Sequence, residues 1–451
     1  MSVLMDEFLI PSFLNLNLKF FSAEKQFRKF RRNKKPLVGT ILPLGAELVF
    51  AAGAAPIFPL RMGKFEAEKL LRGTRLATNI LGSTLVGAGS KMLQPQADSI
   101  VKQFLGEYNK NLCAYEEESD KRNYLPEVCF ATRIAYGSAL PYQDRIQSFL
   151  AWGTRCTWFS QFYQTLHNDI PIIFTDIPIP NHPHTTTTQT TAHIPIPTST
   201  HSHAKDYMYE ELQKLIKHLE SLTGNVIQDE VLREKIQMAN EIKANYRQTL
   251  YYLKEPTKMP LSPYAYMQLL ALLTISFIDY LSAIKYFNKN LSKLIKELNT
   301  RKNIDYSDVP KILLVPVFSG SEPDLPQIIN DLGGCLIQAD NLAYKMLDPI
   351  KTEGDLIENY GEYLLNSHAI WSSSKNVVAS WIDLANDLKV DGIIFNKLVG
   401  CTTLTPAYRL FKDTVSKLDI PSTVIDFNRI GENLAQLKNK LGSFIEIIKN
   451  K

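Results

Sequence analysis

Residues 311–340 read KILLVPVFSGSEPDLPQIINDLGGCLIQAD: an apolar run, a Gly/Ser loop, a helical pattern, a Gly-Gly turn and a second apolar run. This order predicts strand, loop, helix, turn and strand, the repeating unit of a parallel α/β sheet. The alternation continues through VDGIIFNKLVGC (390–401) and the two segments 405–427 and 433–450. We therefore expect a parallel α/β domain over residues 306–451.

A similar α/β domain is predicted over residues 36–180. It opens with KPLVGTILPLGAELVFAAGAAPIFPL (35–60), in which two β-rich runs flank a helix of small residues. Helical spacing follows over 91–111 and 158–167, and IPIIFTDIP (170–178) is expected to be a central strand. The small residues of the first helix predict close packing of that helix on the sheet.

Two other segments separate these α/β domains. Residues 181–205 hold five of the eight histidines among threonines and prolines, so we expect a flexible insertion. A metal-binding role for its histidines is the alternative, although no helical His pair or Cys partner gives a geometry. Residues 206–305 have helical periodicity and are expected to form a helical region.

Composition limits the class of protein. The chain has 451 residues, 45% hydrophobic and 21% charged, which predicts two or three globular domains and excludes a disordered, collagen-like or disulfide-scaffold chain. Its five cysteines are few and odd in number and follow no secretory signal, so we expect reduced thiols in the cytoplasm.

The positive charge is concentrated in a basic N-terminal extension, residues 1–35. Eight Lys or Arg and one acid lie between Lys19 and Lys35, which leaves the rest of the chain slightly acidic. A solvated or partner-docking helical arm is favoured here over a membrane-surface contact, and nucleic acid is disfavoured. No transmembrane segment is expected, because the most apolar stretch, Met267 to Ile284, contains Gln268 and Asp279.

Three of the cysteines lie at boundaries between predicted elements. Cys129 follows LPEV, Cys156 ends the turn GTRC, and Cys401 follows a strand, whereas Cys335 lies inside one. A metal-binding thiolate is favoured at helix starts and loops, where N–H groups stabilise its charge. The spacing matches no known zinc or ferredoxin pattern, so unrelated buried thiols remain the alternative to a shared metal site.

Several motifs together resemble one family. GTILPLGAELVFAAGAAPI (39–57), LPEVC (125–129), a second cysteine before a helix, and IFTDIP (173–178) occur in the order found in the family. DGIIFNKLVGC (391–401), IPSTVIDF (420–427) and ENLAQLKNKLGSFIE (432–446) complete the set. The chain resembles a subunit of the 2-hydroxyacyl-CoA dehydratase and benzoyl-CoA reductase family over residues 35–448, excluding the insertion.

The resemblance implies a fold and a cofactor. Subunits of this family have two similar Rossmann- or flavodoxin-like α/β domains and a helical part, and three cysteines hold one [4Fe-4S] cluster between the domains. Carried over by motif, the ligands are Cys129 and Cys156 in the first domain and Cys401 in the second. Thiolates are the usual ligands of iron–sulfur clusters, and three of them leave one iron without a cysteine.

The implied activity is removal of water from a 2-hydroxyacyl-CoA. One electron converts the thioester to a ketyl radical anion, which expels the α-hydroxyl and makes the β-proton acidic. The resemblance implies a homologous second subunit and a separate ATP-hydrolysing iron–sulfur activator as partners, working anaerobically. The sequence agrees, because it contains no G-x-x-x-x-G-K-[ST] phosphate-binding loop.

Candidate residues other than the cysteines are few. Glu47 precedes the Ala-rich helix and is a candidate acid/base or orienting group, although a carboxylate stabilised by the helix dipole is the alternative. Ser319 and Glu322, in the loop SGSE after a strand, are candidates for contact with CoA, with simple turn formation as the alternative.

The sequence departs from the family pattern at the residues after two of the cysteines. Many relatives have Asp after the second cysteine, where this chain has Thr157, and Thr402 follows the third. The basic extension also has no counterpart in the family. Reduction of an aromatic acyl-CoA, as in benzoyl-CoA reductases, and a non-catalytic or electron-relay subunit remain the alternative functions.

Overall fold

The structure of the protein is a computed structural model of the 451-residue chain. It describes residues 12–13, 15–16, 18, 23–42, 44–62, 94–124, 127–153, 156–178, 198–252, 259–263, 265–267, 269–270, 284–300, 305–317, 320–339, 346–368 and 374–451.

The first sheet is parallel and has the strand order β2-β1-β3-β4. Its strands are β1 (Leu37–Gly39), β2 (Ala55–Ile57), β3 (Ser148–Trp152) and β4 (Ile172–Thr175). All five residues of β3 are buried, as expected for a parallel strand covered on both faces. The short helix α4 (Ala46–Ala51) connects β1 to β2, and its small residues allow the close packing that the sequence predicts.

The second sheet repeats this arrangement in the order β6-β5-β7-β8, also with all strands parallel. Its strands are β5 (Lys311–Val315), β6 (Cys335–Ile337), β7 (Gly392–Leu398) and β8 (Ser422–Phe427). Two parallel sheets with covering helices confirm the predicted α/β fold class. The domain limits given above remain a prediction.

Helices cover the second sheet, and one of them approaches strand β7 so closely that only glycine fits there. The helices are α13 (Leu325–Asp331), α16 (Ser374–Asp387), α17 (Tyr408–Val415) and α18 (Leu434–Lys449). A Cβ on Gly392 would lie 2.6 Å from Ile448 Cδ1 and 2.9 Å from Phe444 Cζ, so α18 packs directly on β7. On α16, Trp381 stacks edge-on against Phe395 of β7 at 5.7 Å between ring centroids.

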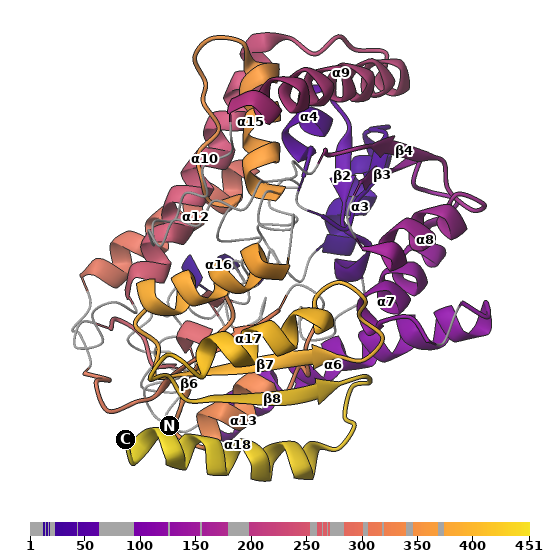
Figure 1. The fold of residues 1–451 in the computed structure, drawn as a ribbon. Helices are drawn as coiled ribbons and strands as arrows, with labels where there is room; N and C mark the ends of the chain where they lie inside the picture. Colours follow the sequence, from indigo (N-terminus) through magenta and orange to yellow (C-terminus); the bar gives the residue numbers. More distant parts are fainter. Residues whose placement is uncertain are drawn as a thin grey trace.

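Long helices flank the first sheet and join it to the second half of the chain. They are α6 (Gln94–Lys121), α7 (Phe130–Ala139), α8 (Thr157–Leu166), α9 (Thr198–Thr223), α10 (Asp229–Tyr251) and α12 (Ile284–Asn299). In Figure 1, α9, α10 and α12 form one side of the molecule, and α7 and α8 lie on the other side between the two sheets. α10 packs on both α12 and α4, whereas α15 (Leu356–His368) packs on α9 and α10. This helical region agrees with the predicted pattern over residues 206–305.

Two predictions for individual elements were wrong. β4 is an edge strand, not a central one, because among the described strands it pairs only with β3, and Phe174 is 58% exposed. The expected flexible insertion ends earlier than predicted, because α9 already begins at Thr198. The start of α9 is tied down by an ion pair of 3.5 Å between Lys205 and Glu362, whereas residues 181–197 lie outside the described residues.

The basic extension includes helix α3 (Ala23–Arg32), which packs on the first domain. Phe27 is buried against Tyr142, with 5.4 Å between the ring centroids, and the Tyr142 hydroxyl hydrogen-bonds to Glu24 at 3.3 Å. The described residues that precede α3 also pack on the body, since Phe13 and Leu16 are buried. Among the described residues of the arm, Phe13 and Phe27 are therefore buried, Phe30 is half-buried and the Lys and Arg side chains are exposed.

Within the described ranges, no helix is long and apolar enough to cross a membrane. Most of the apolar stretch from Met267 to Ile284 lies outside these ranges.

We expect deletion of residues 183–195, with the ends joined through a short Gly/Ser linker, to leave the melting temperature nearly unchanged. The segment is polar and cannot offset its ordering entropy by apolar burial. The deletion must stop before Thr198, because α9 begins there and Ala204 is buried. A matched deletion that extends through Lys205 should lower the melting temperature by several degrees. Equal melting temperatures for the two deletions would contradict this expectation.

Candidate functional site

Each sheet has a topological switch point at the carboxyl ends of its two central strands. In the first sheet the chain leaves β1 toward β2 on one side and β3 toward β4 on the other, and β5 and β7 repeat this divergence in the second sheet. Ligands of open parallel sheets bind at such switch points. Glu47 and Cys156 follow β1 and β3, whereas Glu322 and Cys401 follow β5 and β7. The two sheets thus place a glutamate and a cysteine at equivalent edges.

The three boundary cysteines start or precede helices, as the sequence predicts. Cys129 is the N-cap residue of α7 and Cys156 is the N-cap residue of α8. Cys401 follows β7 and precedes the 3₁₀ turn η7 (Thr405–Ala407). Cys129 and Cys401 are buried and Cys156 is half-buried, and all five cysteines of the chain are free of disulfide bonds. Cys335 is buried within β6, which confirms the prediction of a core cysteine.

The structure brings Cys129, Cys156 and Cys401 together. Cys129 interacts electrostatically with both of the others, and Cys156 with Cys401. Backbone contacts show how close the segments are: a Cβ on Gly400 would lie 2.6 Å from Glu127 O and 3.2 Å from Cys129 N. Thiols separated by up to 272 positions in the sequence therefore meet where the two sheets face each other.

A backbone N–H three residues further along the chain lies near each of the three sulfurs and favours negative charge on it. The donors are Thr132 for Cys129, Phe159 for Cys156 and Leu404 for Cys401. The distance from Leu404 N to Cys401 Sγ is 3.3 Å. N–H groups at the start of a helical turn stabilise a negative charge on sulfur, so the local backbone favours thiolates.

Two threonine hydroxyls also contact the sulfurs. Thr132 Oγ1 lies 3.6 Å from Cys129 Sγ within α7. Thr403 hydrogen-bonds to Cys156, so a residue of the second half of the chain contacts a cysteine of the first. Thr157 and Thr402, where the sequence departs from the family pattern, are both exposed. In the Cys401 loop, the hydroxyl near a sulfur therefore belongs to Thr403 and not to Thr402, to which the sequence points.

Charge on the sulfurs of Cys129 and Cys156 is unfavourable without a counter-charge. Burial raises the pKa of Cys129 to about 11, and negative charge on Cys156 and Cys401 acts in the same direction. Burial likewise raises the pKa of Cys156, although hydrogen bonds from Phe159 and Thr403 oppose the effect. A bound cation reverses this balance, since metal coordination deprotonates a thiol outright. The donor set therefore fits a metal group that binds thiolates.

Among the described residues, no group of three or more His, Cys, Asp or Glu side chains is arranged to hold a single metal ion. Around one ion with bonds of about 2.3 Å, thiolate sulfurs would lie within about 4 Å of one another. In an iron–sulfur cube each thiolate binds a different iron, so the sulfurs are farther apart. The cluster therefore remains a prediction from the resemblance to the family.

Contacts between the two halves of the chain support this triad. Phe130, next to Cys129, packs edge-on against Phe427 at the end of β8, with 4.9 Å between the ring centroids. The buried Arg133 of α7 forms an ion pair of 2.8 Å with Glu116 and donates to Asn428 O at 3.1 Å.

A further contact joins the two loops that carry Cys156 and Cys401. Trp158 Nε1, in the first turn of α8, donates to Gly400 O at 2.5 Å. The helices that begin at Cys129 and Cys156 are therefore anchored on the second sheet (Figure 1).

Glu47 is buried at the first turn of α4, with only 3% of its surface exposed. The Tyr360 hydroxyl donates to Glu47 Oε2 at 2.6 Å, and Gly45 N donates to the same tyrosine oxygen at 3.1 Å. Glu47 is thus bound by a side chain of α15, which is distant in sequence, and not only by the N-terminus of its own helix. The structure leaves its catalytic role a prediction.

Glu322 is also buried, and it closes turns. Its carboxylate accepts hydrogen bonds from the N–H groups of Gly431 at 2.9 Å and Asp324 at 3.3 Å. Burial raises the pKa of Glu322, and these N–H groups oppose the effect. This arrangement agrees with the turn-forming alternative. Ser319 lies outside the described residues, and contact of either residue with CoA remains a prediction.

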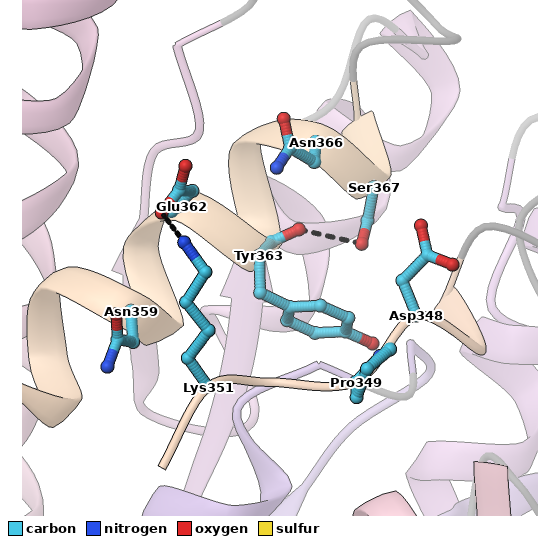
Figure 2. A pocket seen from close by; sticks show the side chains of 8 residues that line it. All are labelled: Asp348, Pro349, Lys351, Asn359, Glu362, Tyr363, Asn366 and Ser367. Atoms are coloured by element: carbon cyan, nitrogen blue, oxygen red, sulfur yellow. Dashed lines mark hydrogen bonds and ion pairs between the residues drawn. The ribbon is translucent and has the colours of Figure 1, made fainter. Parts of the chain in front are cut away.

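A small polar pocket of about 140 Å³ lies beside α15 (Figure 2). Its lining residues are Asp348, Pro349, Lys351, Asn359, Glu362, Tyr363, Asn366 and Ser367. The volume is below the roughly 300 Å³ of ordinary small-molecule sites, so an acyl-CoA does not fit there. None of the site residues predicted from the sequence lines it.

The sequence did not reveal Thr132, Thr403, Tyr360 or Lys243 as candidates. Thr132 is three residues after a cysteine, a spacing that could have been noticed. Tyr360 and Lys243 lie in helical patterns where nothing marks them as partners of Glu47. Only the packing of α10 and α15 on α4 brings them together.

The family assignment rests on a match to a family model. The model for the 2-hydroxyglutaryl-CoA dehydratase D-component matches residues 45–448, a range that includes Glu47 and all three clustered cysteines. None of the curated proteins is similar enough to count as a match. Because the match covers the second sheet, the helical region and all of the first sheet except β1, the chain belongs to the 2-hydroxyglutaryl-CoA dehydratase D-component family.

Proposed function

We propose that the chain is the [4Fe-4S] subunit of an enzyme that dehydrates a 2-hydroxyacyl-CoA, with Cys129, Cys156 and Cys401 as cluster ligands. The observation that carries the proposal is the convergence of these three sulfurs from two sheets, each with a backbone N–H donor. Family membership supports a dehydratase-type component that works with a partner component.

When bound, a cluster held in this way would supply one-electron chemistry: the electron makes the thioester a ketyl radical anion that expels its α-hydroxyl as hydroxide, and it is returned after the β-proton has been removed, so that water is lost without net reduction. The residues of the chain have the other tasks. The three thiolates hold the cluster, the N–H groups of Thr132, Phe159 and Leu404 stabilise their charge, and buried aromatic residues such as Phe130 keep water away.

Glu47 is our candidate for moving the β-proton. It lies at the carboxyl edge of the first sheet, after β1, and Cys156 follows the neighbouring strand β3. A buried position next to a ligand-binding switch point of a sheet is a setting in which enzymes place a general base. Its distance from a bound substrate depends on how the second subunit completes the site.

The electron must come from outside the chain. The sequence contains no phosphate-binding loop of the P-loop type, so we propose a separate ATP-hydrolysing iron–sulfur activator as donor. We also propose a homologous second subunit and an anaerobic cytoplasmic setting. Free cysteines throughout the chain agree with a reducing compartment.

The test is substrate depletion by the anaerobically purified complex. We expect 2-hydroxyglutaryl-CoA, or another 2-hydroxyacyl-CoA, to lose water only when activator and ATP are both present, and benzoyl-CoA to remain unchanged. The isolated chain should be inactive under the same conditions. Consumption of benzoyl-CoA alone would establish the reductase alternative, and no turnover of any acyl-CoA would favour the relay alternative. Dehydration by the isolated chain without ATP would contradict electron injection.

A further inference from the structure

Lys243 is a buried lysine that the proposed chemistry does not use. It lies on α10 and is 1% exposed. Its Nζ donates to Asp348 O at 3.2 Å and lies 3.7 Å from the centroid of the Tyr363 ring. In Figure 2 the Tyr363 ring is directed toward the segment of Asp348 and Pro349. A buried ammonium is costly without an anionic partner, so its surroundings show what the side chain is for.

The charged group with the strongest favourable action on Lys243 is Glu47. Glu47 is itself buried and receives the hydrogen bond of 2.6 Å from Tyr360, one turn before Tyr363 on α15. Glu47 also interacts electrostatically with Tyr363. We refer to Glu47, Lys243, Tyr360 and Tyr363 as the Glu47 cluster.

The Glu47 cluster joins three parts of the chain. α4 belongs to the first sheet, α10 to the helical region and α15 to the second half, and α10 packs on both of the others (Figure 1). Glu47 follows β1 at the carboxyl edge of the first sheet, and the other members of the cluster come from the two helices α10 and α15.

We propose that Tyr360 and Lys243 are positioning residues for Glu47: Tyr360 holds one carboxylate oxygen, and Lys243, on the helix α10 that packs on α4, attracts the buried carboxylate through its positive charge. The proposal rests on the proposed function, in which Glu47 serves the proton transfer. The pairing itself is tested without turnover.

The titration of Lys243 gives this pairing a pH signature. Burial lowers the pKa of Lys243 to about 7, while Glu47 and Asp348 oppose the shift and Arg247 adds to it. Below pH 7 the amine is charged in both the folded and the unfolded state, so its full burial cost is present. As the pH rises from about 7 toward the unfolded value, the folded state loses the proton first and the cost declines.

The first measurement is the melting temperature of the full chain, with its iron retained, at pH 6 and pH 9. The variants are Lys243→Met, Glu47→Gln and the double variant, and Lys293→Met, an exposed lysine of α12, is the control. The melting temperature of Lys243→Met minus that of wild type should fall by roughly 5 °C or more between pH 6 and pH 9. Only wild type is stabilised over this range, because only wild type has Lys243 to deprotonate. Lys293→Met should show no such difference.

The double-mutant cycle separates the pair from the lysine alone. We expect a stabilising coupling between positions 47 and 243 at pH 6 that largely disappears at pH 9, where Lys243 is neutral. Absence of coupling at pH 6, or equal coupling at both pH values, overturns the proposal.

The second measurement is turnover in the reconstituted complex. Tyr360→Phe should lower kcat by about 10-fold or more with little change in KM, because the carboxylate is less well oriented while substrate binding is retained. Tyr142→Phe is the matched control, a buried tyrosine whose hydroxyl donates to Met62 O far from Glu47. Equal effects of the two variants overturn the positioning role. If wild type itself shows no turnover, the proposed function fails, and the coupling at pH 6 still decides the pairing.

Discussion

Replacing Cys129, Cys156 or Cys401 with alanine is expected to remove most of the iron from the anaerobically purified protein. Wild type should contain on the order of four irons per chain and show broad thiolate-to-iron absorbance. Loss of groups that only support a ligand already weakens metal binding by about 10–100-fold, so loss of a ligand should cost more. All three single variants should lose iron to a similar extent, because the three sulfurs meet at one place.

The other two cysteines are matched controls. Cys335 is buried in β6, where burial raises its pKa to about 12, and Cys113 is half-buried on α6. Alanine at either position should leave the iron content and the absorbance spectrum unchanged. Iron loss from all five variants, or no iron in wild type, would refute the ligand assignment. Size-exclusion chromatography of each variant distinguishes cluster loss from global unfolding.

Gly400→Ala is expected to lower both the melting temperature and the iron content, although no ligand is changed. Gly400 has a φ of +78°, and a Cβ there would lie 2.6 Å from Glu127 O and 3.2 Å from Cys129 N. The positive φ alone costs about 1–2 kcal/mol for a residue with a Cβ. The overlap adds to this cost, because backbone atoms cannot rotate away as a side chain can. The Cys401 loop must therefore move away from Cys129.

Gly354→Ala is the control, because Gly354 has a φ of +77° and a Cβ there would meet none of the described atoms within 4 Å. This variant carries the same backbone strain without the overlap. We expect a small loss of melting temperature and full iron content for Gly354→Ala, and a larger loss with less than about half of the iron for Gly400→Ala. Equal iron content in the two variants would show that the spacing between these segments does not matter for the cluster.

The parallel sheets were predictable because their strands carry a local signal. The runs KILLV and GIIFNKL are apolar without alternation, as buried parallel strands are, and turns and helical patterns separate them. Strand position was less predictable. IIFT of β4 has the same composition as a central strand, yet Phe174 is exposed, because position in a sheet depends on which strands pair and not on the strand itself.

Parts of the candidate site could also be read from the sequence. Boundary positions of Cys129, Cys156 and Cys401 suggested metal ligands, and the family motifs grouped them. The hydrogen-bond donors were not readable, because Thr403 reaches Cys156 only through contact between the two halves of the chain. The sequence drew attention to Thr402 instead, because it directly follows Cys401, but Thr402 is exposed.

The sequence by itself determined the α/β class, the helical middle and the family, because periodicity and motifs are local properties of the chain. The tertiary structure alone decided that Thr403 approaches Cys156 and that Glu47 accepts the hydrogen bond of Tyr360. Such meetings depend on how the crossover connections order the strands and on which helices pack together. Those are long-range contacts, and no single segment of the sequence encodes them.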